Sequence, residues 1–169
     1  MVNKVYETSL SKLYTTIDIE HHKVHEGNFF ISSYQWESIG TDNKLIFINP
    51  IASTHLRGAI FAISSGQVDI KMWEGPNITD NGNSVISSNL NRISEKTSPL
   101  EIYVNSSADI MGLNLYNEAI YGDKKTSAFG TKYFPELVLD TSNTYAISVN
   151  TLINTGNVHM LLTYYKYEA

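Results

Sequence analysis

The stretch QVDIKMW, residues 67–73, alternates apolar and polar side chains with a period of two. Val68, Ile70 and Met72 fall on one face of an extended chain, and the charged residues between them fall on the other. This period predicts a strand whose sheet buries one face. A Ser-Gly pair separates it from the preceding apolar run, residues 56–64. We therefore expect the two runs to form a β-hairpin with a two-residue turn.

Short apolar runs separated by turn residues recur over most of the chain. They predict further strands at residues 29–36, 44–48, 100–104, 136–139, 145–149 and 159–167. Met111, Leu113 and Leu115 alternate with other residues in the same way. Irregular connections are expected at residues 74–84 and 121–135, and the best helical candidate, residues 7–14, is weak.

Roughly eight to ten short strands in one chain predict an all-β fold, a single antiparallel β-sandwich that is jelly-roll-like. We find neither an internal repeat nor a linker. Residues 1–26 are expected to form an extended N-terminal arm, because the chain is polar there and lacks a clear period. The β-sandwich domain is then expected over residues 27–169.

The composition argues against several classes of function. The net charge is -5, from 17 acidic and 12 basic residues without a Lys/Arg run, so we expect no direct binding to nucleic acid. With 0 Cys, the chain has neither disulfides nor thiolate chemistry. No apolar run reaches the roughly 18 residues of a membrane helix, and MVNKVYETSLSKLY at the start has no apolar centre. We expect neither a membrane span nor a signal peptide.

Three of the 5 histidines gather in EHHKVHEG, residues 20–27. On a helix, His21 and His25 would share a face, as zinc ligands often do. The metalloprotease pattern, however, has Glu directly after its first His, where His22 stands here. Gly27 and nearby β-branched residues also argue against a stable helix.

Two histidines fall short of the three or four protein ligands that zinc normally takes. His55 or His159 would have to complete such a site in space, so we expect no metal. We instead interpret His21, His22 and Glu26, together with His25, as a polar, hydrogen-bonded surface or a subunit contact.

The sequence contains no distinctive catalytic constellation. Its carboxylates are candidates for acid–base catalysis by residue type alone, because none of them has a characteristic spacing. There is no Gly-rich phosphate loop and no Gly-x-Ser-x-Gly elbow. We therefore expect neither an enzyme nor a bound cofactor.

Aromatic residues offer a second kind of site. The chain has 11 Tyr, together with Trp36 and Trp73. A surface row of such rings would stack on sugars, although packing between strands is the plainer explanation. Arg92 has five fixed donors, which suit it to organise loop carbonyls or to pair with Glu74.

Four segments stand in a recognisable order: TIDIEHHKVHEGNFFISSY (16–34), WEG (73–75), SNLNRIS (88–94) and ELVLDTSNTYAISVNTLINTGNVHMLLTYYKYE (136–168). Together they resemble a family of tailed-phage virion proteins. These share a His-His-x-x-His start followed by Gly, a middle Tyr/Trp-Glu before an Asn-rich segment containing Arg, and Glu-x-x-Leu ahead of Asn-Thr-Tyr. The resemblance covers about residues 16–168. SNLNRIS departs from it, with Leu90 and Ile93 where the family tends to carry Asn.

The resemblance implies a capsid decoration (cement) protein, a virion structural protein of bacteriophages. Such a protein would form a homotrimer on the capsid exterior, bind the major capsid protein and be made in the host cytoplasm. The matching positions here are His21, His22, His25, Glu26, Gly27, Glu74, Asn91, Arg92, Glu136, Leu139, Asn143, Thr144 and Tyr145. The candidate subunit or capsid contacts among them are His21, His22, His25, Glu26, Glu74, Asn91 and Arg92. The alternative is a receptor- or glycan-binding module of a phage head or tail fibre, with Trp36 and Trp73 as stacking candidates.

Overall fold

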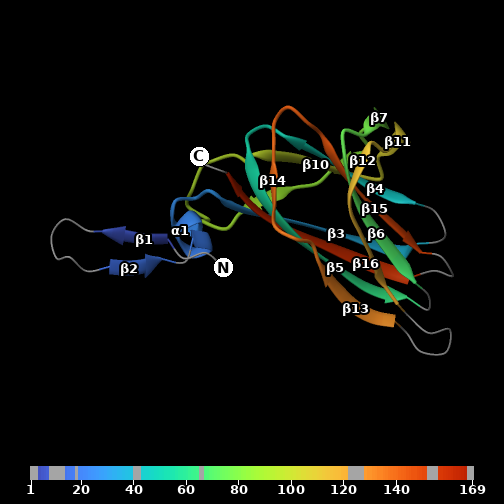
Figure 1. Ribbon diagram of the computed structural model, residues 1–169, viewed down its shortest axis with the longest axis horizontal. Coiled ribbons are helices and arrows are strands. Elements are labelled where there is room, and N and C mark those ends of the chain that lie inside the picture. Colours follow the sequence, from blue (N-terminus) through green and yellow to red (C-terminus); the bar gives the residue numbers. More distant parts are fainter. Residues whose placement is uncertain are drawn as a thin grey trace.

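The computed structural model describes residues 4–7, 14–17, 19–39, 43–64, 67–121, 128–151 and 156–166 (Figure 1). Within these ranges it has one helix, α1 (Ile19–His25). The strands are β1 (Lys4–Glu7), β2 (Tyr14–Ile17), β3 (Phe29–Ile39), β4 (Lys44–Pro50), β5 (Thr54–Ser64), β6 (Val68–Glu74), β7 (Asn77–Asp80), β8 (Asn83–Ser84), β9 (Ser87–Asn89), β10 (Leu100–Val104), β11 (Ser107–Ile110), β12 (Leu113–Ile120), β13 (Ala128–Tyr133), β14 (Leu137–Leu139), β15 (Tyr145–Thr151) and β16 (Gly156–Lys166).

Most strands belong to two antiparallel sheets. Sheet one has the order β12-β6-β15-β4-β10-β8. Sheet two has the order β13-β5-β16-β3-β9, and β14 also pairs with β5. The all-β prediction is therefore confirmed, and the molecule is an antiparallel β-sandwich.

The longer strands follow jelly-roll connectivity. Taken along the chain, these are β3, β4, β5, β6, β12, β13, β15 and β16. The first pairs with the last, the second with the seventh, the third with the sixth and the fourth with the fifth. This is the pattern of a ribbon of paired strands rolled into two sheets. The short strands β7 to β11 form an insertion between β6 and β12.

The predicted hairpin between β5 and β6 is wrong. Both strands form where they were expected, but β5 lies in sheet two and β6 lies in sheet one. β5 pairs with β16 and β13, while β6 pairs with β15 and β12. Strand periodicity identifies the face of a strand that is buried, but it does not identify the neighbouring strand.

The two sheets enclose one apolar core. Val68, Ile70 and Met72 of β6 are each 0% exposed, which confirms the face predicted from their period. Met160 and Leu162 of β16 are buried equally completely in sheet two. Full burial of one such side chain stabilises a fold by roughly 1.5–3 kcal/mol. This core holds the two ends of the sandwich, where the loops gather, at fixed positions.

Three local predictions have different outcomes. Residues 74–84 contain β7 and β8, and residues 121–135 contain β13, so neither segment is wholly irregular. Leu113 and Leu115 alternate along β12 but are exposed, because β12 is the outer strand of sheet one. The weak helix expected at residues 7–14 meets strands at both ends, and residues 8–13 lie outside the described ranges.

The N-terminal strands form a unit of their own. β1 and β2 pair with each other in a two-stranded antiparallel sheet. Figure 1 shows this hairpin lying to one side of the sandwich, beyond α1. No helix in the described part of the chain is long and apolar enough to span a membrane.

Candidate functional site

The histidine-rich segment forms helix α1, contrary to the prediction. The cap at its C-terminal end explains how a helix of only seven residues is stabilised. Gly27 has φ +70°, the Gly27 N–H donates to the Val24 carbonyl at 3.0 Å, and the Asn28 N–H donates to the Lys23 carbonyl at 2.9 Å. These bonds form a Schellman motif, in which a left-handed glycine satisfies the last carbonyls of a helix.

Side-chain contacts on the surface of α1 add to this cap. The Glu26 carboxylate lies 2.9 Å from His22 Nε2 and 2.9 Å from Lys23 Nζ. The hydrogen bond from Lys23 lowers the pKa of Glu26, outweighing burial, which raises it. Glu20 lies in the first turn and the basic residues lie in the last, an arrangement that complements the helix dipole.

His21 and His25 share one exposed face of α1. Their Nε2 atoms are 3.0 Å apart, and the rings meet edge to face with centroids 4.5 Å apart. The other two histidines have different neighbours, since His55 stacks on Tyr165 and His159 stacks on Phe61. Across the described ranges, no group of three or more His, Cys, Asp or Glu side chains could hold a metal ion.

The structure brings the SNLNRIS segment against the end of α1. Asn91 Nδ2 donates to the His25 carbonyl at 3.0 Å, and Asn89 Nδ2 donates to the Gly27 carbonyl at 2.8 Å. A Cβ atom built on Gly27 would lie 2.2 Å from Ser94 Oγ, so the loop sits directly on the glycine. We call this contact between α1 and residues 89–96 the helix–loop junction. Two motifs some sixty residues apart thus form one unit, in which Asn89 and Ser94 were not anticipated.

The loop is also braced internally. The Asn91 N–H donates to Asn89 Oδ1 at 2.9 Å, and the Ile93 N–H donates to Asn91 Oδ1 at 3.3 Å. The Ser94 N–H donates to the Asn91 carbonyl at 3.0 Å. Side-chain amides that bond to backbone two residues away form Asx turns, which fix loops without regular structure. Arg92 is carried at the tip of this loop and is exposed.

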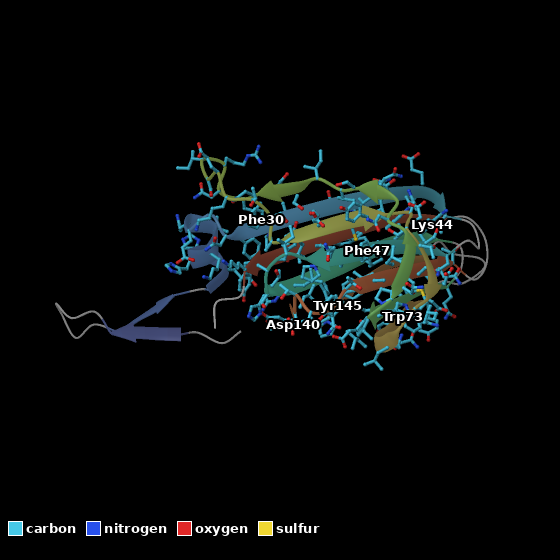
Figure 2. All side chains as sticks on the ribbon, turned by 90° about the horizontal axis from the view of Figure 1, so that it is seen from above. Phe30, Lys44, Phe47, Trp73, Asp140 and Tyr145 are labelled. Atoms are coloured by element: carbon cyan, nitrogen blue, oxygen red, sulfur yellow. The ribbon has the colours of Figure 1, made fainter. Side chains whose placement is uncertain are left out.

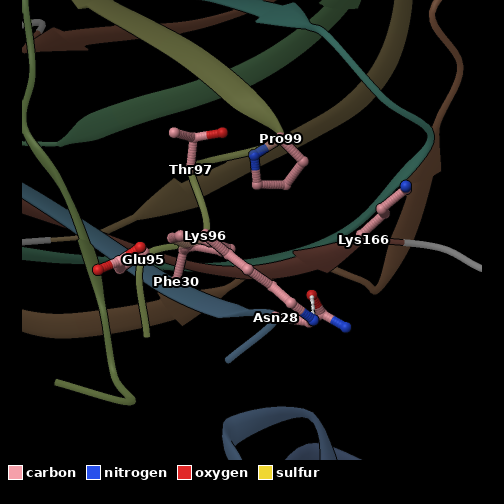
Figure 3. Close-up of a pocket in the computed structure, with 7 residues that line it drawn as sticks. All are labelled: Asn28, Phe30, Glu95, Lys96, Thr97, Pro99 and Lys166. Atoms are coloured by element: carbon pink, nitrogen blue, oxygen red, sulfur yellow. Dashed lines mark hydrogen bonds between the residues drawn. The ribbon is translucent and has the colours of Figure 1, made fainter. Parts of the chain in front are cut away.

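A groove opens beside the helix–loop junction (Figure 3). It has a volume of about 390 Å³ and is lined by Asn28, Phe30, Glu95, Lys96, Thr97, Pro99 and Lys166. Lys96 Nζ donates to Asn28 Oδ1 at 3.0 Å, and Asn28 Nδ2 donates to Glu26 at 3.3 Å. The lining therefore offers polar and cationic contacts next to the candidate residues, but these seven side chains include no imidazole base for the Thr97 hydroxyl.

Arg57 joins α1 to sheet two. It pairs with Glu20 in the first turn of the helix, and its Nη2 donates to Glu136 Oε2 at 2.7 Å. His55 Nδ1 and the Tyr165 hydroxyl lie 2.9 and 3.3 Å from the other Glu136 oxygen. We call these five residues the Arg57 cluster. Sequence analysis did not single out Arg57, because Glu20 and Glu136 lie far from it along the chain.

The Arg57 cluster shifts the proton affinities of its members. The hydrogen bond from Arg57 lowers the pKa of Glu136, and the same bond raises the pKa of Arg57. Burial, with the Glu136 charge next in importance, raises the pKa of Tyr165 to about 12. Each shift favours the form that completes the hydrogen bonds, so the cluster acts as a brace between helix and sheet.

Glu74 belongs to a second cluster at the turn before β15. Its Oε1 accepts hydrogen bonds from Asn143 Nδ2 at 3.1 Å and from the Tyr145 hydroxyl at 3.2 Å. The Asp140 N–H donates to the Tyr145 oxygen at 3.1 Å, and Figure 2 shows Asp140 and Tyr145 close together. The suggested pairing of Arg92 with Glu74 is wrong, since the described residues place Glu74 with this turn instead.

The structure gives a different outcome for each of the two tryptophans that were predicted to stack on sugars. Trp36 is 5% exposed, and its Nε1 donates to Asn105 Oδ1 at 3.0 Å. Its ring faces are covered, so Trp36 offers no platform for a sugar. Trp73 is half-buried on the outer face of sheet one, where its Nε1 donates to Ser148 Oγ at 3.0 Å.

Trp73 lies in a row of side chains across that outer face. β-Register places Trp73 opposite Ala146, Ala146 opposite Phe47, and Phe47 opposite Tyr103. The Phe47 and Tyr103 rings stack with centroids 5.8 Å apart. Figure 2 shows Phe47 and Trp73 on neighbouring parts of this sheet. The row provides aromatic surface, although Phe47 itself is buried.

No protein-family model matches the chain, and no curated protein matches it. Among solved structures, the chain is similar to the extra small virus particle of the giant freshwater prawn Macrobrachium rosenbergii, with 11% identity and a TM-score of 0.24. That match covers 100% of this chain and 97% of the other. A second match is VP2 of infectious bursal disease virus, with 12% identity and a TM-score of 0.18, covering 98% of this chain and 46% of the other. Neither TM-score supports an inference about function.

Proposed function

We propose that the protein is a capsid decoration protein of a tailed phage, which binds the major capsid protein on the outside of the head and stabilises it. The observation that carries this proposal is that residues of the resemblance motifs contact one another and hold loops in place. His25, Gly27 and Asn91 join in the helix–loop junction, and Glu74 and Tyr145 join in the second cluster. Each contact fixes the shape of a loop, which suits a protein that works through its surface.

The mechanism is bridging. Each copy lies across a boundary between capsomers and adds interface area, so that internal pressure from packaged DNA must break additional contacts. The exposed face of α1, with His21 and His25, is the proposed capsid contact, because the junction holds it rigidly against the sandwich. The hairpin β1–β2 forms part of the proposed N-terminal arm, which would lie along a neighbouring subunit in the particle.

Purified protein tests this proposal when it is added to expanded, empty shells of the parent phage that lack it. We expect saturable binding and a higher melting temperature of the shells. The double variant His21→Ala/His25→Ala should bind more weakly, while His159→Ala, at an exposed histidine on β16, should bind like the wild type. A shell melting temperature that does not rise on saturation contradicts the proposal.

The row from Trp73 to Tyr103 favours a second candidate, a glycan- or receptor-binding module of a phage head or tail fibre. Aromatic rings on a sheet face provide the apolar contact that sugar rings need, and neighbouring polar groups supply hydrogen bonds. Asn49 Nδ2 donates to Glu101 Oε2 at 2.8 Å beside this row. Binding on a glycan array that Trp73→Ala weakens and Trp36→Phe preserves would favour this function over decoration.

A further inference from the structure

Exposed apolar side chains gather at both edges of the sandwich. On one side the sheets end in β12 and β13, which lie together because the Tyr116 hydroxyl of β12 donates to the Tyr133 carbonyl of β13 at 3.4 Å. On the other side they end in β8 and β9, which are joined by residues 85–86. We call these the β12 edge and the β8–β9 edge.

The β12 edge is formed by a long outer strand with exposed apolar side chains. Leu113 is 63% exposed and Leu115 is 40% exposed, with Ile110 at 66% just before them and Tyr133 at 73% on β13. Among the described strands, β12 pairs only with β6. A long apolar outer strand is a place where proteins associate unless something covers it.

The β8–β9 edge differs in form but also carries apolar side chains. Its strands have only two and three residues, and the adjoining segment carries Ile86 at 84%, Ile93 at 92% and Leu90 at 41% exposed. The Leu90 N–H donates to the Phe29 carbonyl at 3.0 Å, and the Asn89–Asn91 hydrogen bonds brace the rest. These side chains are therefore presented on a fixed backbone.

Each edge carries one exposed charge beside its apolar residues, and the two charges are opposite in sign. Asp109, which is exposed, precedes Ile110 at the β12 edge. Arg92, also exposed, lies between Leu90 and Ile93 at the β8–β9 edge. An apolar contact flanked by opposite charges has both the buried area and the orientation that a specific interface needs.

We propose that the β12 edge of one copy of this chain binds the β8–β9 edge of the next copy, head to tail. A two-fold contact of either edge with itself would leave the other apolar edge exposed, whereas a head-to-tail contact repeated around a ring covers both. This deepens the proposed decoration function and rests on it only for the number of subunits, the three that the family resemblance implies. Arg92 then serves the contact between copies.

Disulfide crosslinking tests the pairing directly, because the chain has 0 Cys and hence no background. In the double variant Leu113→Cys/Ile93→Cys, oxidation should link copies into a ladder that ends at the size of the ring. Each single variant should stay a single chain on a denaturing gel, because the contact joins different edges. Leu113→Cys/Ile51→Cys is the matched control, since Ile51 is an exposed isoleucine in the bend after β4 and belongs to neither edge.

Mass in solution gives an independent readout. At about 0.1 mM, above the micromolar Kd of many weak specific contacts, the wild type should have a multiple of the 19.0 kDa chain mass. Leu113→Asp and Ile93→Asp should each be monomers, and Ile51→Asp should match the wild type. A mixture of the two edge variants should form a two-chain complex, because each retains the edge that the other needs.

Three results overturn the proposal: a monomeric wild type, efficient crosslinking of either single-cysteine variant, or one edge variant that keeps the wild-type mass. These outcomes are separate from shell binding, which is measured by the melting temperature of the shells. A protein that stabilises shells as a monomer would retain the decoration function and lose the ring. A ring that does not change the melting temperature of the shells would retain the head-to-tail contact and contradict the decoration function.

Discussion

At the scale of single residues, Arg57 ties helix α1 to sheet two through Glu20 and Glu136. Replacing it by Met keeps the apolar stem and removes both ion pairs. We expect Arg57→Met to lower the free energy of unfolding by about 1–2 kcal/mol, since the three groups are about a third exposed and remain partly hydrated. Urea unfolding followed by circular dichroism measures the change.

The matched control is Arg92→Met. Arg92 is exposed at a loop tip, so its replacement should change the free energy of unfolding of the monomer by less than about 0.5 kcal/mol. Equal losses for the two variants would show that Arg57 contributes only general surface charge.

The lowered pKa of Glu136 makes stability depend on pH in a defined direction. Arg57 holds the folded-state pKa below the ordinary value of 4.5, so the ionised carboxylate favours the folded state. Its contribution is present above the ordinary pKa and is lost as the pH falls through the lowered value. We expect the free energy of unfolding to fall from about pH 5 to about pH 3, and to fall less steeply in Arg57→Met. Parallel pH profiles for the two proteins would contradict this assignment.

At the scale of elements, the end of α1 depends on Gly27. A side chain there meets two costs, the left-handed φ of +70° and contact with Ser94 at 2.2 Å. Gly75 has a similar φ of +68° but no atom within 4 Å of an added Cβ, so it isolates the first cost. We expect Gly75→Ala to lower the free energy of unfolding by about 1 kcal/mol and Gly27→Ala to lower it by at least about 1 kcal/mol more.

Thermal or urea unfolding of both glycine variants gives the comparison. Adding Ser94→Gly to Gly27→Ala should remove most of the excess loss, because the obstructing side chain is then absent. If Gly27→Ala and Gly75→Ala lose the same stability, the loop does not rest on the glycine as the structure indicates.

At the scale of the whole molecule, the last strand holds sheet two together. β16 lies between β5 and β3 and pairs with both along most of its length. We expect deletion of residues 156–169 to abolish cooperative unfolding, because the sheet loses its central strand and the core loses Met160, Leu162 and Tyr164. Near-UV circular dichroism during heating measures the loss.

Deletion of residues 1–17 is the matched truncation. It removes β1 and β2, which pair only with each other among the described strands. Cooperative unfolding should survive, with a loss of at most about 1 kcal/mol, because no sandwich strand loses its partner. A shortened chain that fails to fold would show that the hairpin belongs to the sandwich.

Strand positions followed from local sequence because strand formation depends on side-chain period and turn residues. Residues 67–73 and 145–149 became β6 and β15 within a residue or two. The partners of those strands were not encoded locally. The hairpin expected between β5 and β6 failed because a jelly roll sends consecutive strands to opposite sheets, and either partner buries the same face.

Helix α1 was missed for a related reason. Ile, Val and His have low intrinsic helix propensity, so the isolated segment is not expected to form a helix. In the folded protein, contacts with other residues outweigh this low propensity. The Gly27 cap, the Glu26 ion pairs, the Asn91 amide and Arg57 all stabilise the helix from outside its own backbone. Of the candidate contact residues, sequence reasoning found His25 and Asn91 separately, but it had no means of placing one against the other.

The amino-acid sequence by itself determined that this protein is an all-β sandwich, since alternating apolar residues and frequent turn residues act over a few neighbouring positions. The tertiary structure alone decided which strands pair, that EHHKVHEG is a helix held by a distant loop, and that the apolar residues of β12 face outward. The physical reason is range. Burial and turns depend on near neighbours, whereas register, caps and interfaces depend on groups brought together only when the chain has folded.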